Sequence, residues 1–279
     1  MAKLLYLSKR GRPDIQLAIA FLTTRVSCST EEDLIKLKRV FLYLKGTRDL
    51  TLTLGADSLT KIDTWVDAAY AVHEDMKSHT GGAVSMGCGA FMCKSIKQKL
   101  NTKSSTEAEV VGASDFLPST IWARMFMASQ GFVFSENTFH QDNMSAILLS
   151  RNGRSSSGQK TRHIDIRYFF MQDRFDSENM LLTHCPTAAM LADFFTKPLQ
   201  GSLFKKFRDV ILGYKHISIL QSPDQSIDDS VPSVPSPPIE ERVDFNIPVV
   251  ESRTDSDGFT VHVRKRTRKQ PVVAAVSVS

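Results

Sequence analysis

Cysteine is scarce in this sequence, and long apolar runs are missing from it. The 279 residues include four cysteines, which are scattered along the chain: Cys28, Cys88, Cys93 and Cys185. Such thiols do not make a disulfide framework or a zinc site, so we expect a reducing, intracellular compartment, cytoplasmic or nuclear. No apolar run approaches the roughly 18 residues of a spanning helix, and the first residues lack the apolar core of a secretory signal. We therefore expect neither a membrane-bound nor a secreted protein.

Charge of one sign does not dominate the whole chain, but it does dominate one part. The chain has 35 Lys and Arg against 30 Asp and Glu, a net charge of +5. Residues 221–279 hold 7 of the basic and 9 of the acidic residues, which leaves 28 and 21, or +7, for residues 1–220. With 42 % hydrophobic residues the chain can build a core, which excludes disorder throughout. The basic part is compatible with binding a polyanion.

The C-terminal segment, residues 221–279, differs in composition from the rest. It contains seven of the eleven prolines, with many serines and acids. Because such a composition cannot support a packed core, we predict disorder over about residues 221–260. A short basic run follows: Arg264, Lys265, Arg266, Arg268 and Lys269. This run could serve nuclear import or nucleic-acid binding, or it could be a solvated tail without a specific role.

The hydrophobic period in residues 1–220 predicts helices first and then strands alternating with helices. Residues 1–48 are expected to be helical, with helices over 13–26 and 29–46. Strands are predicted at 50–54, 62–67, 82–87, 90–96, 137–142 and 180–185. Further helices are predicted from residue 104 onward, with a kink or break at Pro118, and at 144–150, 163–175, 188–196 and 203–211. Residues 49–200 are therefore expected to form a mixed α/β sheet flanked by helices, followed by an amphipathic helix within 201–220.

Four acidic residues stand at positions where a carboxylate is unusual. Asp67 and Asp142 end predicted strands, whereas Glu109 and Asp193 lie in predicted helices, and apolar residues flank all four. Partly buried acids need a partner, and a hard divalent cation is one such partner. Together the four carboxylates could hold two Mg²⁺ ions about 3.5–4 Å apart, which suits the hydrolysis of a phosphodiester. Taken singly, an acid at such a position is more often an ordinary strand-end or helix-surface residue than a metal ligand.

Seven short motifs give the chain a resemblance to a known family. Five of them resemble, in order, the ribonuclease H domain of copia-type LTR retrotransposon polyproteins: DAAY, SSTEAE, DNMSA, KTRHIDIRYFF and THCPTAAMLADFFTKPL. Two upstream motifs resemble the stretch that links reverse transcriptase to ribonuclease H in the same polyproteins: RGRPDIQLAIAFL and LKRVFLYLKGT. The resemblance implies a ribonuclease H-like fold with a five-stranded mixed sheet. It also implies Mg²⁺-dependent hydrolysis of the RNA strand of RNA–DNA hybrids, and Mn²⁺ accepts the same oxygen ligands.

The resemblance assigns roles to single residues of this sequence. It makes Asp67, Glu109, Asp142 and Asp193 the catalytic and metal-binding acids. Glu107 lies about 200° round a helix from Glu109, so both cannot face one pair of ions, and the alternative role of Glu107 is a capping box with Ser104.

A histidine before the last acid is a further point of comparison with the family. His184 could match a family histidine in a mobile loop that helps product release, but it falls in a predicted strand, where a structural role is the alternative.

Basic residues near the predicted site could bind the substrate backbone. A hybrid duplex is recognised by its shape, its phosphates and its 2′-OH groups, which requires a positive surface blind to base sequence. The candidates are Lys94, Lys97, Lys99, Lys103, Arg151, Arg154, Lys160, Arg162 and Arg167. Each could instead be an ordinary charge that keeps the protein soluble.

One polymerase feature of the family is missing from the sequence. No Tyr-x-Asp-Asp motif occurs, so we expect no polymerase activity from this chain and expect a reverse transcriptase domain to be its partner in a parent polyprotein. Two functions remain open on this basis. One is a ribonuclease H, and the other is a catalytically inactive remnant that binds nucleic acid or a partner.

Overall fold

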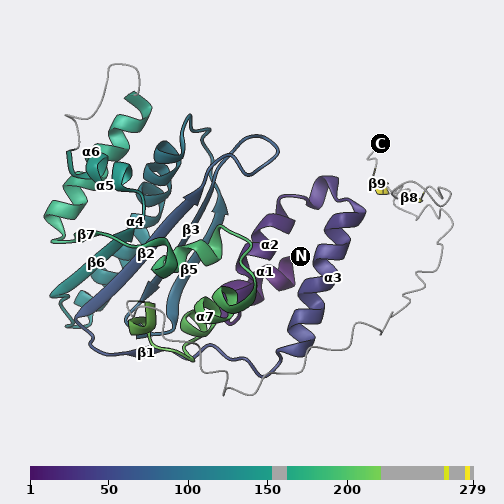
Figure 1. The fold of residues 1–279 in the computed structure, drawn as a ribbon, viewed down its shortest axis with the longest axis horizontal. Coiled ribbons are helices and arrows are strands. Elements are labelled where there is room, and N and C mark those ends of the chain that lie inside the picture. Colours follow the sequence, from purple (N-terminus) through teal and green to yellow (C-terminus); the bar gives the residue numbers. More distant parts are fainter. Residues whose placement is uncertain (153–161, 221–260, 264–273, 277–279) are drawn as a thin grey trace. The chain divides into compact units, whose positions relative to one another are not determined.

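The computed structural model describes residues 1–152, 162–220, 261–263 and 274–276 (Figure 1). The chain divides into two compact units, Met1–Ala20 with Leu50–Gln225 and Phe21–Asp49 with Ser226–Ser279. Residues 1–20 thus belong to the same unit as the predicted sheet, and the predicted origin of residues 1–48 in a polymerase connection stays a prediction. The predicted disorder of residues 221–260 and the basic run at 264–269 lie outside the described residues.

A five-stranded mixed sheet forms the centre of the first unit. Its strands are β2 (Lys61–Ala69), β3 (His79–Ser85), β5 (Ala90–Lys97), β6 (Glu136–Gln141) and β7 (Leu181–His184). The order across the sheet is β5-β3-β2-β6-β7 (Figure 1). Strand β3 pairs antiparallel with both β2 and β5, whereas β6 pairs parallel with β2 and β7 pairs parallel with β6. This arrangement confirms the predicted fold class, a ribonuclease H-like mixed sheet. Because β2, β6 and β7 run parallel, their carboxyl ends meet at one edge of the sheet, which is where ligands bind in open α/β sheets.

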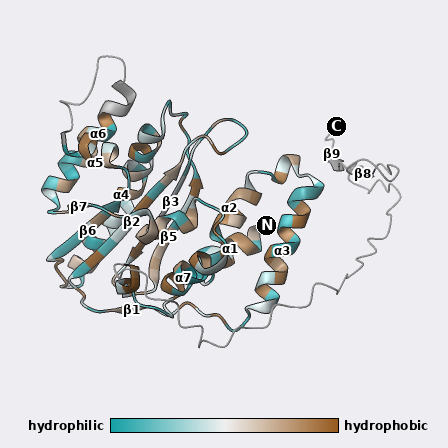
Figure 2. Cartoon of the chain, in the orientation of Figure 1, coloured by the Kyte–Doolittle hydropathy of each residue, from teal (hydrophilic) through white to brown (hydrophobic). Residues whose placement is uncertain are grey.

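Helices cover both faces of this sheet. The first face packs on α4 (Ser105–Ser129), α5 (Met144–Asn152) and α6 (Arg162–Ser177), and the second on η5 (Leu191–Phe195) and α7 (Gly201–Leu212). The alternation in β2 explains the two cores, because Val66 joins the cluster around Phe116 whereas Trp65 joins the cluster around Phe195. The hydropathy view shows apolar residues along the central strands and both an apolar and a polar side on α7 (Figure 2).

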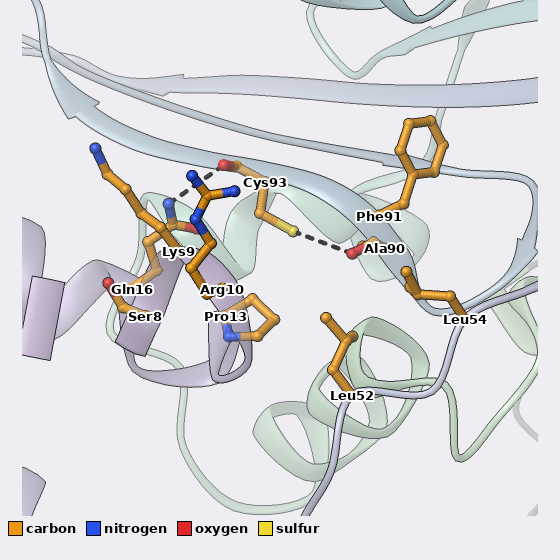
Figure 3. Close-up of a pocket in the computed structure, with 10 residues that line it drawn as sticks. All are labelled: Ser8, Lys9, Arg10, Pro13, Gln16, Leu52, Leu54, Ala90, Phe91 and Cys93. Carbon is orange, nitrogen blue, oxygen red and sulfur yellow. Dashed lines mark hydrogen bonds between the residues drawn. The ribbon is translucent and has the colours of Figure 1, made fainter. Parts of the chain in front are cut away.

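The N-terminal helices of the first unit cover the edge strand β5. They are α1 (Ala2–Arg10), η1 (Pro13–Ile15) and the start of α2 (Gln16–Thr23). Gln16 Nε2 donates to the Cys93 carbonyl at 3.2 Å, which satisfies part of the open edge of β5. A pocket of about 170 Å³ lies here, with Lys9, Arg10 and Gln16 on one side and Leu54 and Phe91 on the other (Figure 3).

The second unit contains η2 (Val26–Cys28), the helix α3 (Glu31–Gly46) and a short antiparallel pair of strands, β8 (Val261–Val263) and β9 (Ala274–Val276). At the start of α3, Thr30 Oγ1 accepts from the Asp33 N–H, and Asp33 accepts from the Thr30 N–H at 3.0 Å. Within the described residues, no helix is both long enough and apolar enough to cross a membrane.

The strand predicted over residues 50–54 is wrong. The segment is irregular, and the first pairing along it is β1 (Gly55–Ala56) with β4 (Gly87–Cys88). Alternating leucine and threonine gave a period of 2, but the backbone N–H groups are satisfied by the end of α7 instead. Thr53 N–H donates to the Leu212 carbonyl at 2.9 Å, and Thr51 N–H donates to the Tyr214 hydroxyl at 3.0 Å.

Two helix predictions also need correction. Pro118 does not divide α4, which runs from Ser105 to Ser129, because the buried residues on either side, Leu117 and Thr120, hold the helix against the sheet. The helix expected at 188–196 is instead a pair of 3₁₀ turns, η4 (Thr187–Ala189) and η5. The short 3₁₀ form matters for the site, because η5 carries Asp193.

Candidate metal-binding acidic site

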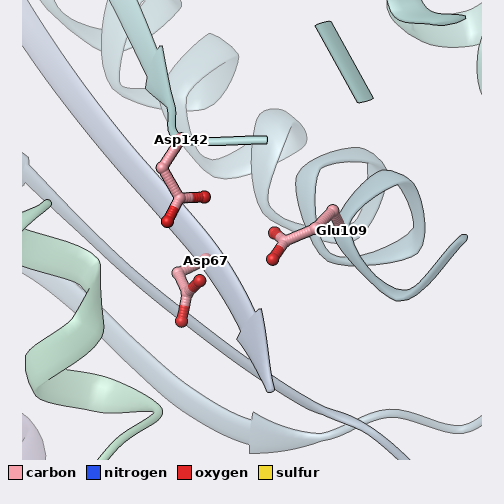
Figure 4. A group of neighbouring side chains, drawn as sticks. All are labelled: Asp67, Glu109 and Asp142. Atoms are coloured by element: carbon pink, nitrogen blue, oxygen red, sulfur yellow. The ribbon is translucent and has the colours of Figure 1, made fainter. Parts of the chain in front are cut away.

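Three of the predicted acids converge at the carboxyl ends of the parallel strands. Asp67 lies near the end of β2, Asp142 directly follows β6, and Glu109 projects from the second turn of α4 (Figure 4). Carboxylate oxygens of the three residues all lie within 4.8 Å of one another. Asp67 and Glu109 are buried, with exposed fractions of 2 % and 6 %, and Asp142 is half-buried.

The start of α4 explains why Glu109 rather than Glu107 reaches this site. Ser104 Oγ accepts from the Glu107 N–H at 3.2 Å, and Glu107 Oε2 accepts from the Lys103 N–H at 2.7 Å. Glu107 is therefore occupied in capping the helix. Gly112, one turn further on, lets α4 approach the sheet closely, since a Cβ there would lie 3.1 Å from Thr80 Oγ1.

Gln141 connects two of the acids, and the sequence reasoning missed it. Its Oε1 accepts from the backbone N–H groups of Asp142 at 2.8 Å and Asn143 at 3.1 Å, which shapes the turn from β6 into α5. Its Nε2 donates to Glu109 Oε2 at 3.3 Å. The available signal was its position directly before the Asp-Asn pair.

Asp193 lies beside the three converging acids but is linked to them through a lysine. Lys197 Nζ lies 2.7 Å from Asp193 Oδ1 and 3.7 Å from Asp67 Oδ1. Thr196 Oγ1 donates to Asp67 Oδ2. Sequence reasoning missed Thr196 and Lys197 as site residues, although both stand in the DFFTKPL motif directly after the acid.

Burial and mutual repulsion shift the pKa values of the site acids upward. Burial, together with the charges of Asp67 and Asp142, raises the pKa of Glu109 well above its usual range. Burial and Asp67 likewise raise the pKa of Asp142. For Asp193 the same two causes raise the pKa to about 7, although Lys197 opposes them. Burial lowers the pKa of Lys197, but the charges of Asp67 and Asp193 outweigh it, and the net shift is upward.

The donor set fits a hard divalent cation. Three carboxylates offer oxygen ligands, which Mg²⁺ and Mn²⁺ prefer, and no softer sulfur or imidazole ligand belongs to the group of three. Burial and the neighbouring carboxylates disfavour the charged forms of Glu109 and Asp142. A bound cation would stabilise those charged forms.

His184 lies next to the site rather than in it. It is the last residue of β7, paired in register with Gln141, and its side chain is exposed. Its charge lowers the pKa of Asp142, so the two groups interact electrostatically. Both the structural role and the product-release role stay predictions.

The predicted phosphate contacts differ in their partners within the protein. Lys94 donates to Ser119, Lys97 lies 2.8 Å from Asp75, and Arg167 lies 2.5 Å from Asp115. Arg151 donates to the Leu182 carbonyl at 2.6 Å. Lys99 and Lys103 are exposed near the start of α4. Arg154, Lys160 and the side chain of Arg162 lie outside the described residues.

Comparison with known proteins identifies the family that the motifs indicated. The chain is a relative of the copia-type, retrovirus-related Pol polyproteins of transposons. It is 29 % identical over 212 residues to the Pol polyprotein from transposon TNT 1-94 of Nicotiana tabacum, covering 76 % of this chain. It is 31 % identical over 202 residues to that of transposon RE1 of Arabidopsis thaliana, covering 72 % of this chain. The chain spans only 16 % and 14 % of the lengths of these two relatives.

Two further comparisons complete the set. No protein-family model matches the sequence. Among solved structures, the chain is similar to the LC11 ribonuclease H1 isolated from compost, with 12 % identity and a TM-score of 0.35 over 49 % of this chain and 92 % of that one.

Proposed function

We propose that this chain hydrolyses the RNA strand of RNA–DNA hybrids, as one region of a Pol polyprotein, with two Mg²⁺ or Mn²⁺ ions. The observation that carries the proposal is the convergence of Asp67, Glu109 and Asp142, whose carboxylate oxygens lie within 4.8 Å of one another. The ribonuclease H-like sheet and the relationship to transposon Pol polyproteins support a nuclease-type hydrolase.

The residues around the acids have distinct parts in this proposal. Asp67, Glu109 and Asp142 would hold the ions, with Asp193 at the margin. The chemistry that ions bound by these acids would supply is activation of a water for attack on the phosphodiester and stabilisation of the leaving oxygen. Gln141 orients Glu109 by its 3.3 Å hydrogen bond, and Thr196 holds one oxygen of Asp67 while the other faces Lys197.

The proposed substrate requires contacts that do not depend on base sequence. Lys99 and Lys103 are exposed beside the start of α4, which also carries Glu109, so they suit phosphates close to the cleaved bond. Cleavage of many hybrid sequences at similar rates is the expected behaviour.

The decisive experiment compares two neighbouring glutamates of α4. Glu109→Gln should lower the Mg²⁺-dependent cleavage of a labelled hybrid by at least about 10²-fold, as expected when one charged group of a catalytic site is lost. Glu107→Gln is the matched control, because the side-chain oxygen of glutamine can still accept from the Lys103 N–H, and it should cleave within about twofold of wild type. Asp142→Asn should behave like Glu109→Gln.

Two outcomes of this experiment would contradict the proposal. Folded wild-type protein that does not cleave with Mg²⁺ or Mn²⁺ would refute the proposal, and so would equal activity of the two glutamate variants.

The alternative function, an inactive nucleic-acid-binding or partner-binding remnant, finds one support in the site. The Lys197 ammonium already lies between Asp193 and Asp67 and partly neutralises them without an ion. A remnant of this kind would bind hybrids in a salt-sensitive manner without cleaving them, and Asp142→Asn would not weaken that binding.

A further inference from the structure

A chain of buried hydrogen bonds lies behind the turn that carries Asp193. His73 Nε2, in the loop after β2, lies 3.0 Å from His79 Nδ1, at the start of β3. His79 Nε2 lies 2.8 Å from Ser95 Oγ on β5, and Ser95 Oγ donates to the Phe195 carbonyl of η5 at 2.8 Å. The three polar residues are buried, with exposed fractions of 6 %, 3 % and 4 %.

The carbonyl end fixes the direction of every hydrogen bond in this chain. The carbonyl of Phe195 can only accept, so the single hydroxyl hydrogen of Ser95 is used there. Ser95 Oγ must then accept from His79 Nε2–H, and His79 Nδ1 must accept from His73 Nε2–H. The His79 imidazole is therefore neutral with its proton on Nε2, and His73 carries a proton on its own Nε2.

The electrostatics agree with this single arrangement. Burial, together with His73, lowers the pKa of His79 to about 4. Burial and Lys97 lower the pKa of His73, while Asp75 opposes them. A proton on His79 Nδ1 would point at the His73 N–H, so protonation of His79 would break the chain.

The hydrogen-bonded end of the chain lies directly on the candidate site. In the sheet, Asp67 on β2, Gly81 on β3 and Ser95 on β5 are in register. A Cβ at Gly81 would lie 2.7 Å from Phe195 Cβ and 2.6 Å from Thr196 Cγ2, so this part of η5 rests on the bare backbone of β3. Ser95 thus reaches the Phe195 carbonyl at the point where the next two residues, Thr196 and Lys197, contact Asp67.

We propose that His79 is a positioning residue that acts through Ser95 and the Phe195 carbonyl to hold Thr196 and Lys197 against Asp67. The same residue ties the loop after β2 to η5 through His73, so one chain of hydrogen bonds joins these two segments. This inference rests on the proposed function, because Asp67 is the residue whose surroundings it sets.

A pair of serines provides the matched test. Ser95→Ala removes the bond to Phe195, and Ser85→Ala removes an equivalent buried bond, from Ser85 Oγ to the Gly89 carbonyl at 2.7 Å. We expect Ser95→Ala to raise the Mg²⁺ concentration for half-maximal thermal stabilisation about 10–100-fold, the usual effect of residues behind metal ligands. Ser85→Ala should leave it within about twofold, at a similar loss of Tm.

Variants of His79 test the middle of the chain. His79→Leu should raise the required Mg²⁺ concentration as Ser95→Ala does. In His79→Gln the side-chain Nε2–H₂ can still donate to Ser95, so the required Mg²⁺ concentration should return most of the way to the wild-type value. If His79→Leu does not fold, Ser95→Ala against Ser85→Ala decides alone. Equal ion requirements for the two serine variants would overturn the proposal.

A spectroscopic readout separates this proposal from the proposed function. Nitrogen-15 NMR of wild-type protein at pH 7 should show His79 as the neutral Nε2–H tautomer and a proton on His73 Nε2, with the His79 proton losing its exchange protection in Ser95→Ala. A neutral Nδ1–H form, or a protonated His79 ring, would overturn the hydrogen-bond direction whether or not the protein cleaves hybrids. A wild-type protein that neither cleaves nor gains stability with Mg²⁺ or Mn²⁺ would overturn both proposals together, since no ion site would remain to be positioned.

Discussion

At the scale of single residues, the carboxylates of the site are held close together at a cost to the fold. Carboxyl groups of an unfolded chain have pKa values of about 4. In the folded protein the pKa of Asp193 is raised to about 7, and that of Glu109 is raised well above its usual range. The folded state therefore binds more protons than the unfolded state between these values. For these groups, the free energy of unfolding falls as the pH rises through that window.

This fall in the free energy of unfolding with rising pH should disappear in part when Glu109 cannot titrate. In metal-free protein at pH 8, Glu109→Gln should unfold at a higher temperature than wild type, because glutamine does not titrate and so avoids the cost of burial and neighbouring charges that raises the Glu109 pKa. Each kcal/mol gained should raise Tm by about 2–4 °C. The difference should shrink as the pH falls towards the ordinary range of glutamate, because the unfolded state then binds the same proton. Thermal unfolding in EDTA measures it, and a lower Tm for the variant at pH 8 would contradict it.

Comparing the variant with wild type at each pH removes an opposing effect of His79. Its pKa is lowered to about 4, so folding favours its neutral form. This contribution is complete above about pH 6.5 and is lost as the pH falls towards about 4. The two trends have opposite signs in wild type, but His79 is present in both proteins.

Removing the Lys197 charge should shift the pH dependence of cleavage clearly while lowering the stability of the fold only a little. Lys197→Met should move the acidic limb of the pH–rate profile to higher pH, because the ammonium no longer opposes the upward shift of the Asp193 pKa. The free energy of unfolding should fall by only about 1 kcal/mol, because 40 % of the Lys197 side chain is exposed and solvent screens its charge. Lys205→Met, at an exposed position on α7, is the control. An unchanged limb would refute this role.

Single residues also show what the sequence could and could not predict about the site. The resemblance placed Asp67, Glu109, Asp142 and Asp193 in one group, of which the first three converge and Asp193 is joined to Asp67 through Lys197. The family frame and the angle round the helix separated Glu109 from Glu107. Gln141 and Lys197 were missed because their roles depend on side-chain contacts across elements, which no sequence periodicity distinguishes from those of a surface residue.

At the scale of elements, close approach between β3 and η5 is a requirement of the fold. Gly81 allows it, as the backbone of Phe195 lies 2.9 Å from the position of a Cβ there. Gly81→Ala should displace η5, lower Tm by several degrees and reduce cleavage by about 10²-fold, since small misplacements at a site have such effects. Gly11→Ala is the control, with nothing within 4 Å of its Cβ position. Cleavage at the wild-type rate by Gly81→Ala would show that η5 does not depend on this contact.

Elements with a strong internal pattern were the easiest to predict. The alternation in β2 and the capping signal of α4 both depend on neighbouring residues, and both elements are present. Residues 50–54 have the same alternation but form no strand, because their backbone partners are Leu212 and Tyr214 at the far end of the unit. Pro118 shows the reverse case, in which packing on the sheet outweighs a local helix breaker.

At the scale of the whole molecule, the charge of residues 1–220 predicts how hybrid binding responds to salt. Each phosphate contact adds about one unit to the slope of log affinity against log salt. Lys99→Ala and Lys103→Ala should each reduce the slope by about that amount, equally for hybrids of different sequence. Lys94→Ala should change the slope less, because Lys94 donates to Ser119. Fluorescence anisotropy at several salt concentrations checks this, and sequence-dependent losses would contradict it.

The parallel pairing of β2 with β6 has a consequence for how the molecule is made. A ribosome synthesises β2, β3, β5 and α4 before β6, and the first three strands pair through antiparallel neighbours that are close in sequence. Asp67 and Glu109 lie on elements made before β6, and Asp142 adds its repulsion to theirs only when β6 docks beside β2. Because pairing between strands far apart in the sequence is slow, we expect the repulsion that Asp142 adds to fall on a later step of folding than the pairing of β2, β3 and β5.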